Sequence, residues 1–120
     1  MKKKVLIVED AIIIAEDLAA SVEELGYDMV GIADNAPEAF EIIEARKPDV
    51  ALLDINLGTE IDGLDIAKKL NEVYQLPFIF ITAFSSKQTQ EKIANLNPKG
   101  YLVKPFENEE LEAALVKALE

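Results

Sequence analysis

The sequence predicts an α/β domain in which a parallel sheet is covered by helices on both faces. Five short apolar runs of strand length alternate with five segments in which apolar residues have helical spacing. The runs are continuous and lack polar alternation, which indicates strands that are buried on both faces. Because crossovers between parallel strands are right-handed, this alternation places helices on both sides of the sheet.

The expected strands cover residues 5–8, 29–33, 50–53, 78–81 and 101–103. Gly26 is expected to end the first helix, Pro37 to begin the second and Asn108 to cap the fifth. The fourth helical segment, "SSKQTQEKIANL", is polar, and Ile93 is one of its few apolar anchors. The residues expected to face the sheet are Ile14, Leu18, Val22 and Leu25 in the first helix, Phe40 and Ile43 in the second, Ile66, Leu70 and Val73 in the third, and Leu111, Leu115 and Leu119 in the fifth.

The composition of the chain excludes several classes of function. The 120 residues fit one compact domain, and no apolar run approaches the length of a membrane span. Cysteine and histidine are absent, which excludes disulfides, thiol chemistry, histidine bases and most zinc sites. The net charge of -11 argues against direct nucleic acid binding, because that binding neutralises phosphates with Lys and Arg. We expect a cytoplasmic protein that makes no contact with a membrane.

Polar and charged side chains follow four of the five expected strands. Glu9 and Asp10 end the run "VLIVED", Asp54 ends "DVALLD", Thr82 ends "FIFIT" and Lys104 follows "YLV". In open α/β sheets, ligands bind beyond the carboxyl ends of the strands. Two adjacent carboxylates tolerate each other when they share a hard cation, and three carboxylates on one rim suit Mg²⁺.

Each of these residues has a simpler interpretation. Glu9 and Asp10 could only begin a helix, where carboxylates favour the helix dipole, and Asp54 could be a helix cap. Thr82 could be an ordinary strand residue, and Lys104 a solvated strand end. Their joint placement at four strand ends favours a common site.

These motifs resemble the response-regulator receiver domain of two-component signalling, and the resemblance covers essentially the whole chain. The acid pair resembles the metal-binding acids of that family, and "LLDINL" places the phosphoacceptor on Asp54. "ITA" and "GYLVKPF" place the site hydroxyl on Thr82 and the site lysine on Lys104. The fold implied by the resemblance is flavodoxin-like, a (βα)5 sheet of strand order 2-1-3-4-5.

The resemblance also implies how the site works. The metal would be Mg²⁺, with ligands from Glu9, Asp10, Asp54 and the backbone carbonyl of Asn56. Asp54 would accept a phosphoryl group from a histidine kinase or a histidine phosphotransfer protein. Thr82 and Tyr101 would form the switch, acting on the face made by the fourth helix, fifth strand and fifth helix. Asn56 and Phe84 would tune the later attack of water.

The same resemblance bears on class and partners. The chain would catalyse only its own Mg²⁺-dependent phosphorylation and dephosphorylation, and would signal to a downstream effector or output domain. We expect residues 1–120 to form a single receiver domain without an output domain in this chain; a free-standing protein and a piece of a longer regulator both stay open. Two other classes of function remain. One is a receiver-like interaction module that is never phosphorylated. The other is an aspartate phosphatase, but this chain has Asn56 at the position where such enzymes carry a second acid.

Some features of this sequence depart from the common pattern of receiver domains, and others go beyond it. Glu9 stands where Asp is commoner, and the loop "INLGTEIDG" is one residue longer and has Gly58 where Pro is frequent. The resemblance implies a cis peptide bond before Pro105. Ile12 and Ile13 are predicted to point away from the apolar face of the first helix. They form either a docking surface for a helical partner or a patch buried under neighbouring loops.

Overall fold

The sheet has five parallel strands, and their order within the sheet is the predicted one. The computed structural model describes residues 2–55, 63–82 and 87–120. The strands are β1 (Lys4–Val8), β2 (Asp28–Ala33), β3 (Val50–Asp54), β4 (Phe78–Thr82) and β5 (Gly100–Val103). They lie in the order β2-β1-β3-β4-β5, which is the flavodoxin-like arrangement.

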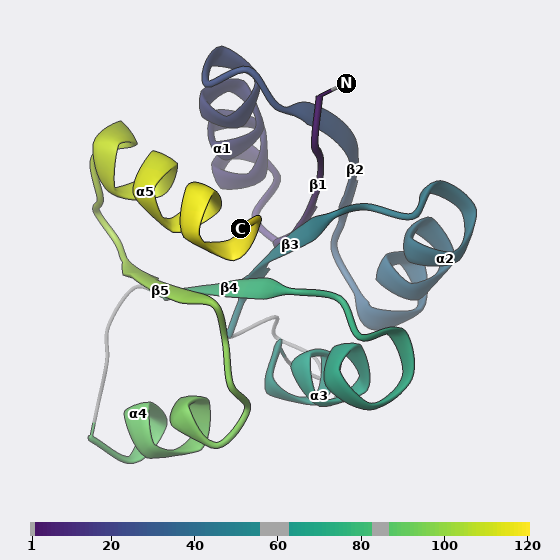
Figure 1. Ribbon diagram of the computed structural model, residues 1–120, viewed down its shortest axis with the longest axis vertical. Coiled ribbons are helices and arrows are strands. Elements are labelled where there is room, and N and C mark those ends of the chain that lie inside the picture. The colour runs from purple at the N-terminus through teal and green to yellow at the C-terminus, as the bar shows by residue number, and fades with distance from the viewer. Residues whose placement is uncertain (1, 56–62, 83–86) are drawn as a thin grey trace.

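Helices cover both faces of this sheet, as predicted. They are α1 (Ile12–Glu24), α2 (Ala36–Arg46), α3 (Gly63–Lys69), α4 (Lys87–Ala94) and α5 (Asn108–Ala118), and a π-helical turn, η1 (Leu70–Tyr74), continues α3. Figure 1 shows α1 and α5 on one side of the sheet and α2, α3 and α4 on the other. Among the described helices, none has the length and apolar character needed to cross a bilayer.

The core forms two layers because successive side chains of a strand point to opposite faces. In β4, Phe78 and Phe80 belong to the layer under α2, α3 and α4, and Ile79 belongs to the layer under α1 and α5. The rings of Phe78 and Phe80 meet edge to face, with 5.3 Å between their centroids. This two-sided burial explains why the strands are continuous apolar runs.

The helix ends follow local signals, with one correction. Gly26 follows Leu25, the C-cap of α1, and adopts φ 97°, a left-handed conformation that suits glycine, so its predicted role at the end of the helix is confirmed. The Asn35 side chain caps α2 by accepting a hydrogen bond from the Glu38 N–H at 2.9 Å. Asn108 is the first residue of α5, and the cap is Glu107, whose N–H donates to Glu110 Oε1 at 3.2 Å.

Two residues predicted to face the sheet are exposed. Ile14 is 42% exposed, because α1 packs through Ala15 and Ala19 together with the expected Leu18 and Val22. The small side chains of Ala15 and Ala19 let the helix approach the sheet closely. A prediction that looks only for large apolar residues does not find these two positions. Val73 is 60% exposed because it lies in η1, where the change to π-helical winding shifts the phase set by Ile66 and Leu70.

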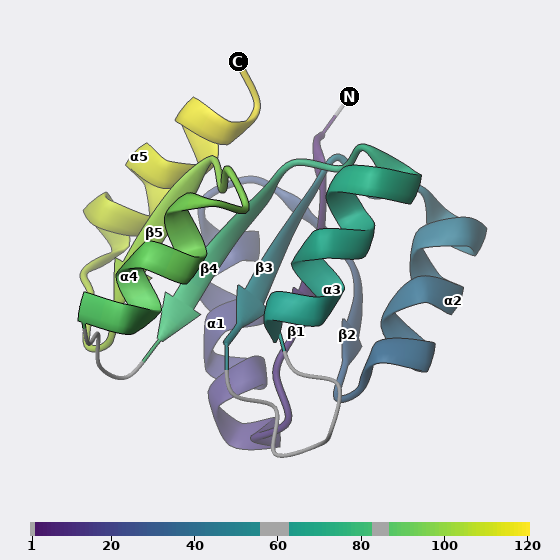
Figure 2. The same cartoon turned by 90° about the horizontal axis from the view of Figure 1, so that it is seen from below.

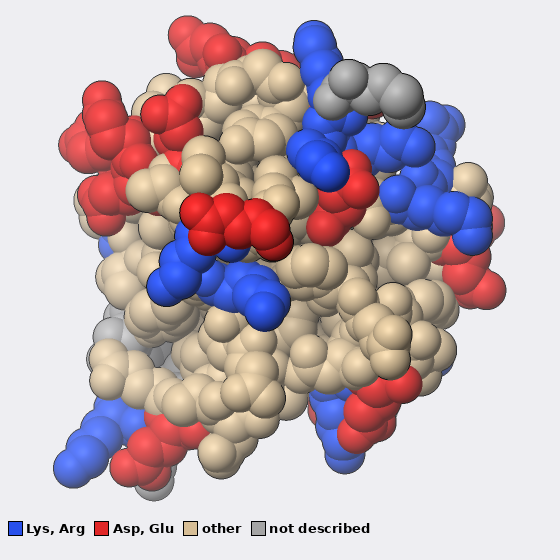
Figure 3. Space-filling view, in the orientation of Figure 1, with Lys and Arg blue, Asp and Glu red and all other residues tan. Residues whose placement is uncertain are grey.

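The strands all run in one direction, so their ends define two edges of the sheet. Figure 2 shows both chain termini near the amino edge and the start of α1 near the carboxyl edge. The charges are distributed unevenly between the edges. Figure 3 looks onto the amino edge, where Lys and Arg side chains gather over the start of β1 and toward α2. The acidic residues at the ends of β1 and β3 lie at the opposite edge.

Candidate functional site

Strand pairing brings the predicted site residues to one edge. Val8 pairs with Leu53 in β3, so Glu9 and Asp10 leave β1 beside Asp54. Asp54 in turn pairs with Ile81, which precedes Thr82 in β4. On the other side of β4, the Lys104 N–H donates to the Thr82 carbonyl oxygen at 2.7 Å. Residues that are far apart in the sequence therefore meet at the carboxyl edge.

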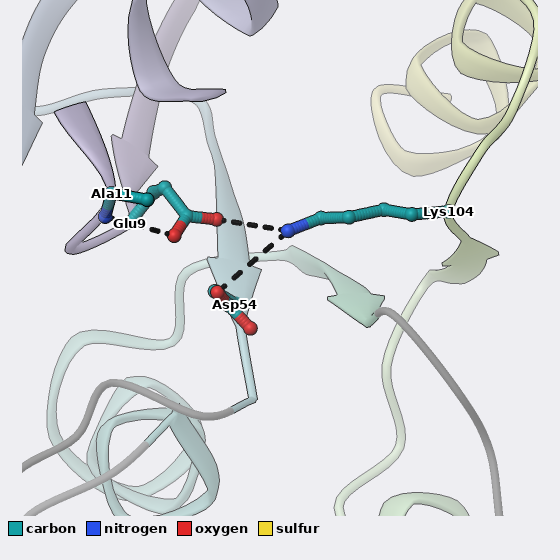
Figure 4. Close-up of polar contacts among 4 residues, drawn as sticks. All are labelled: Glu9, Ala11, Asp54 and Lys104. Carbon is teal, nitrogen blue, oxygen red and sulfur yellow. Dashed lines mark hydrogen bonds and ion pairs between the residues drawn. The ribbon is translucent and has the colours of Figure 1, made fainter. Parts of the chain in front are cut away.

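Lys104 extends across this edge and contacts two carboxylates (Figure 4). Its Nζ donates to Glu9 Oε2 at 3.1 Å and lies 3.8 Å from Asp54 Oδ2. The Glu9 side chain is only 4% exposed, so this ammonium compensates a carboxylate that has little access to water. Lys104 therefore joins Glu9 and Asp54 in one cluster of charges and is not a solvated strand end.

The second oxygen of Glu9 is also engaged. Glu9 Oε1 accepts a hydrogen bond from the Ala11 N–H at 3.1 Å, next to the first turn of α1. A carboxylate there satisfies a backbone donor that lacks a partner within the helix. Glu9 thus contacts the backbone at the start of α1 as well as the Lys104 ammonium.

Three carboxylates converge closely enough to hold a cation. Ligand oxygens of Glu9, Asp10 and Asp54 lie within 4.8 Å of one another. Glu9 is buried, Asp54 is half-buried and Asp10 is exposed, so the group opens to solvent on one side. Among the described residues, the Lys104 ammonium pairs with two of these three carboxylates, so the three acids together outweigh its charge. The donor set and its charge fit a hard divalent cation such as Mg²⁺.

The two predicted switch residues lie on neighbouring strands. Thr82 is buried at the end of β4. Tyr101 in β5 is half-buried against the core layer under α2, α3 and α4, and it lines a hollow of about 240 Å³ with Ile93 of α4. Within the described part of the chain, its buried hydroxyl has no hydrogen-bond partner. Asn56, Gly58 and Phe84 lie outside the described residues. The Lys104–Pro105 peptide bond is cis, as expected.

Sequence reasoning missed a supporting residue, Gly63. It is the first residue of α3, and its N–H donates to the Ile55 carbonyl at 3.0 Å. A Cβ atom at this position would lie 2.9 Å from the Ile55 Cα and closer still to the Asp54 carbonyl oxygen. The sequence did contain a signal for this contact. Gly63 stands at the first position of a helix, where a side chain is normally tolerated, so a glycine there indicates that another segment lies close.

Comparison with known proteins identifies the family. The response regulator receiver domain profile matches residues 5–116. This chain belongs to the response regulator receiver family. As a receiver domain it takes part in two-component signal transduction, and this family does not consist of conventional enzymes.

Individual relatives agree with this assignment. The receiver is 36% identical to the transcriptional regulatory protein PdtaR of Mycobacterium tuberculosis, over 98% of this chain and 57% of that protein. It is also 36% identical to the phyllosphere-induced regulator PhyR of Methylorubrum extorquens, over 99% of this chain and 44% of that protein. The chain therefore spans about half the length of these curated relatives.

Solved structures share the fold. The receiver superposes with a TM-score of 0.91 on the signal receiver domain of a modulated diguanylate cyclase from Desulfovibrio desulfuricans, at 38% identity and over 99% of this chain and 94% of that one. It superposes with a TM-score of 0.89 on the BeF3-activated N-terminal receiver domain of RstA from Klebsiella pneumoniae, at 27% identity and over 98% and 99% of the two chains.

Proposed function

We propose that this receiver is a phosphorylation-dependent switch whose phosphoacceptor is Asp54. The observation that carries the proposal is the convergence of three carboxylates and the Lys104 ammonium at the carboxyl edge of the sheet. We take residues 1–120 as one receiver domain. The phosphodonor is a histidine kinase or a histidine phosphotransfer protein, in keeping with two-component signalling.

The metal ligands in this proposal are Glu9, Asp10, Asp54 and the Asn56 backbone carbonyl. When Mg²⁺ is bound, it neutralises charge on the phosphoryl oxygens. Lys104 would also neutralise phosphoryl charge, because its Nζ lies 3.8 Å from Asp54 Oδ2 and can pair with a phosphoryl oxygen as a compact charge. Thr82, at the end of the adjacent strand, supplies a hydroxyl donor to another oxygen.

The chemical step is an in-line transfer. An Asp54 carboxylate oxygen attacks phosphorus, a phosphorus–oxygen bond forms, and the bond from phosphorus to the donor's imidazole nitrogen breaks. The nitrogen keeps the electron pair, and the product is an acyl phosphate on Asp54. Water later attacks this acyl phosphate and releases inorganic phosphate, at a rate set in part by Asn56 and Phe84.

The proposed output runs through the face made by α4, β5 and α5. The phosphoryl group would draw Thr82 toward it, and Tyr101 would respond because it lies on the adjoining strand and packs beside α4. Few apolar anchors hold α4, so its position is the easiest to shift. A downstream effector or an output domain would read this change.

Phosphorylation of the purified chain tests the proposal. The chain is incubated with acetyl phosphate, with and without Mg²⁺, and its intact mass is measured beside that of Asp54→Ala. We expect a gain of one phosphoryl group that requires both Mg²⁺ and Asp54. Asp28→Asn, which changes an exposed acid at the start of β2, is the matched control and should be modified like the parent. A folded parent that gains no mass would favour the alternative of a non-phosphorylated interaction module.

A further inference from the structure

A hollow of about 460 Å³ lies between the end of α2 and η1. It belongs to the amino edge of the sheet, because Pro48 in its lining precedes β3 and Leu76 precedes β4. The residues that line it are Ile43, Glu44, Lys47, Pro48, Tyr74 and Leu76. None of them belongs to the cluster of charges around Asp54, so the proposed phosphorylation makes no use of this hollow.

The hollow combines an apolar interior with a fixed aromatic wall. The buried members of its lining are all apolar, namely Ile43, Pro48 and Leu76. The Tyr74 ring stacks on the Phe40 ring with 5.8 Å between their centroids, and the Tyr74 hydroxyl donates to Glu44 Oε2 at 3.3 Å. Because these contacts hold Tyr74 before any ligand arrives, the hollow is preorganised, which lowers the entropic cost of binding.

Positive charge gathers at the same edge, over the start of β1 and toward α2 (Figure 3). Arg46 ends α2 and Lys47 lines the hollow. The first lysines of the chain lie against the loop that follows, because the Lys4 N–H donates to Asp49 Oδ2 and the Asp49 N–H donates to the Lys4 carbonyl, both at 2.8 Å. The exposed cations of this group are Lys2, Lys3, Arg46 and Lys47.

These four cations are not neutralised within the fold. In the part of the chain that the structure describes, none of them forms an ion pair. Arg46 and Lys47 suit the C-terminus of α2, where the helix dipole is negative, but Lys2 and Lys3 precede a strand. Lys47 also adopts φ 49°, a conformation that disfavours any side chain. In a chain with a net charge of -11, this local excess of positive charge favours an acidic partner.

We propose that the hollow and the four cations, here called the amino-edge site, bind an acidic segment of a partner protein. A leucine or aromatic side chain of the segment enters the hollow and packs against its apolar lining. Carboxylates on either side of it pair with Arg46, Lys47 and the lysines before β1. Because this edge is opposite to the edge of Asp54, the partner can stay bound while the chain is phosphorylated. The proposal goes beyond the proposed function and does not depend on it.

Two other occupants fit this surface less well. A nucleic acid strand would extend past the cations onto a surface that is acidic overall, and its phosphates do not match an apolar lining. A second copy of the chain could offer Ile12 and Ile13, which are 69% and 74% exposed and so are not buried under neighbouring loops. Each copy has a net charge of -11, however, so two whole chains repel, whereas a short acidic segment places its charge only on the cations.

Fluorescence anisotropy with a defined probe tests the proposal. The probe is a short labelled peptide of aspartate and glutamate around a central leucine–phenylalanine pair. One control peptide has serines in place of that pair, and another has lysines in place of the acids. We expect saturable binding of the probe at low ionic strength, binding of the serine peptide that is weaker by about tenfold or more, and no binding of the lysine peptide.

Two substitutions of Glu44 separate the hollow from the charge around it. Glu44→Gln removes an acid from the lining and leaves the hollow open, so it should bind the probe at least as tightly as the parent does. Glu44→Trp makes the same change of charge but covers the hollow with a large ring, so it should lower the affinity by about tenfold or more. Because Glu44 is exposed, both variants should fold, and urea unfolding checks that they do.

A second pair of variants tests the cations. Arg46→Gln/Lys47→Gln should lower the affinity several-fold at low ionic strength and flatten its dependence on salt, because salt screens exposed charges. Lys87→Gln/Lys92→Gln removes two exposed cations from α4, which does not line the hollow, and should bind like the parent. Both double variants should be phosphorylated by acetyl phosphate like the parent, since neither changes the candidate site.

Several results would overturn the proposal. Absence of saturable binding, or equal affinity of the parent and Glu44→Trp, would show that the hollow takes no acidic segment. Equally tight binding of single-stranded RNA that is lost in Glu44→Trp would assign this edge to nucleic acid. A dimer in sedimentation that Glu44→Trp dissociates would assign it to a second copy. Phosphorylation is a separate readout: if acetyl phosphate does not modify the parent chain, the proposed function fails, while binding of the probe still decides the amino-edge site.

Discussion

Gly63 packs against the backbone of Asp54 so closely that no side chain fits between them. A Cβ atom on Gly63 would lie within 2.9 Å of the Ile55 Cα and closer to the Asp54 carbonyl oxygen. Because the obstructing atoms are backbone, they cannot rotate away. The first turn of α3 is therefore coupled to the position of the proposed phosphoacceptor.

Gly63→Ala should lower the free energy of unfolding by about 1–3 kcal/mol, as overpacking does, and should also slow phosphorylation by acetyl phosphate. Urea denaturation and intact mass give the two readouts. Gly26→Ala is the matched control: its φ of 97° costs roughly 1 kcal/mol with a Cβ, but no atom lies within 4 Å, so phosphorylation should be unchanged. Equal slowing in both variants would show that Gly63 acts only through stability.

Lys104→Met should destabilise the fold by about 1–3 kcal/mol, because it leaves the buried Glu9 carboxylate without its ammonium. The loss should be largely recovered in Glu9→Gln/Lys104→Met, which removes both charges. A double-mutant cycle on urea unfolding measures the coupling between Glu9 and Lys104. Independent effects of the two substitutions would contradict the ion pair at 3.1 Å.

Mg²⁺ should raise the thermal midpoint of the chain, because a ligand that binds only the folded state stabilises it. The gain is about 2.7 kcal/mol at a free concentration ~100 times the dissociation constant. Asp10→Asn and Asp54→Asn should each reduce this gain, since each removes one of the three converging carboxylates. Glu72→Gln, on η1, should keep it. A stabilisation that survives both aspartate substitutions would place the cation elsewhere.

Tyr74 should titrate above its ordinary pKa of 10.0. Burial raises the pKa of its hydroxyl most, and the charge of Glu44 and the hydrogen bond to it at 3.3 Å raise it further. A raised pKa means that this group's stabilisation is complete below pH 10 and is lost as the pH rises through the folded value. NMR titration of the ring should show a lower pKa in Glu44→Gln that still exceeds 10.0, because burial remains.

Tyr27 is the internal reference for this titration. Burial, and then the charge of Glu112, raise the pKa of Tyr27, so Glu44→Gln should not move it. Tyr74→Phe should remove one titration and leave that of Tyr27 in place. A Tyr74 pKa at or below 10.0 in the parent chain would refute the contact with Glu44.

Much of the fold follows from local patterns in the sequence. Each predicted strand coincides with an observed one to within one residue at either end, because strands buried on both faces must be continuously apolar. The candidate site residues could also be predicted from the strand pattern. Parallel strands end at a common edge, so the polar residues that follow apolar runs must gather there, as Glu9, Asp54 and Lys104 do.

The sequence by itself determined the order of elements along the chain and the carboxyl edge at which Glu9, Asp54 and Lys104 gather. Only the tertiary structure decided that Ala15 and not Ile14 faces the core, that Lys104 pairs more closely with Glu9 than with Asp54, and that Gly63 touches the acceptor's backbone. A strand that is buried on both faces is apolar at nearly every position, so its prediction does not depend on which residues point to which face. Helix faces turn by about 100° per residue, and contacts between distant segments depend on atomic packing, so neither can be read from local composition.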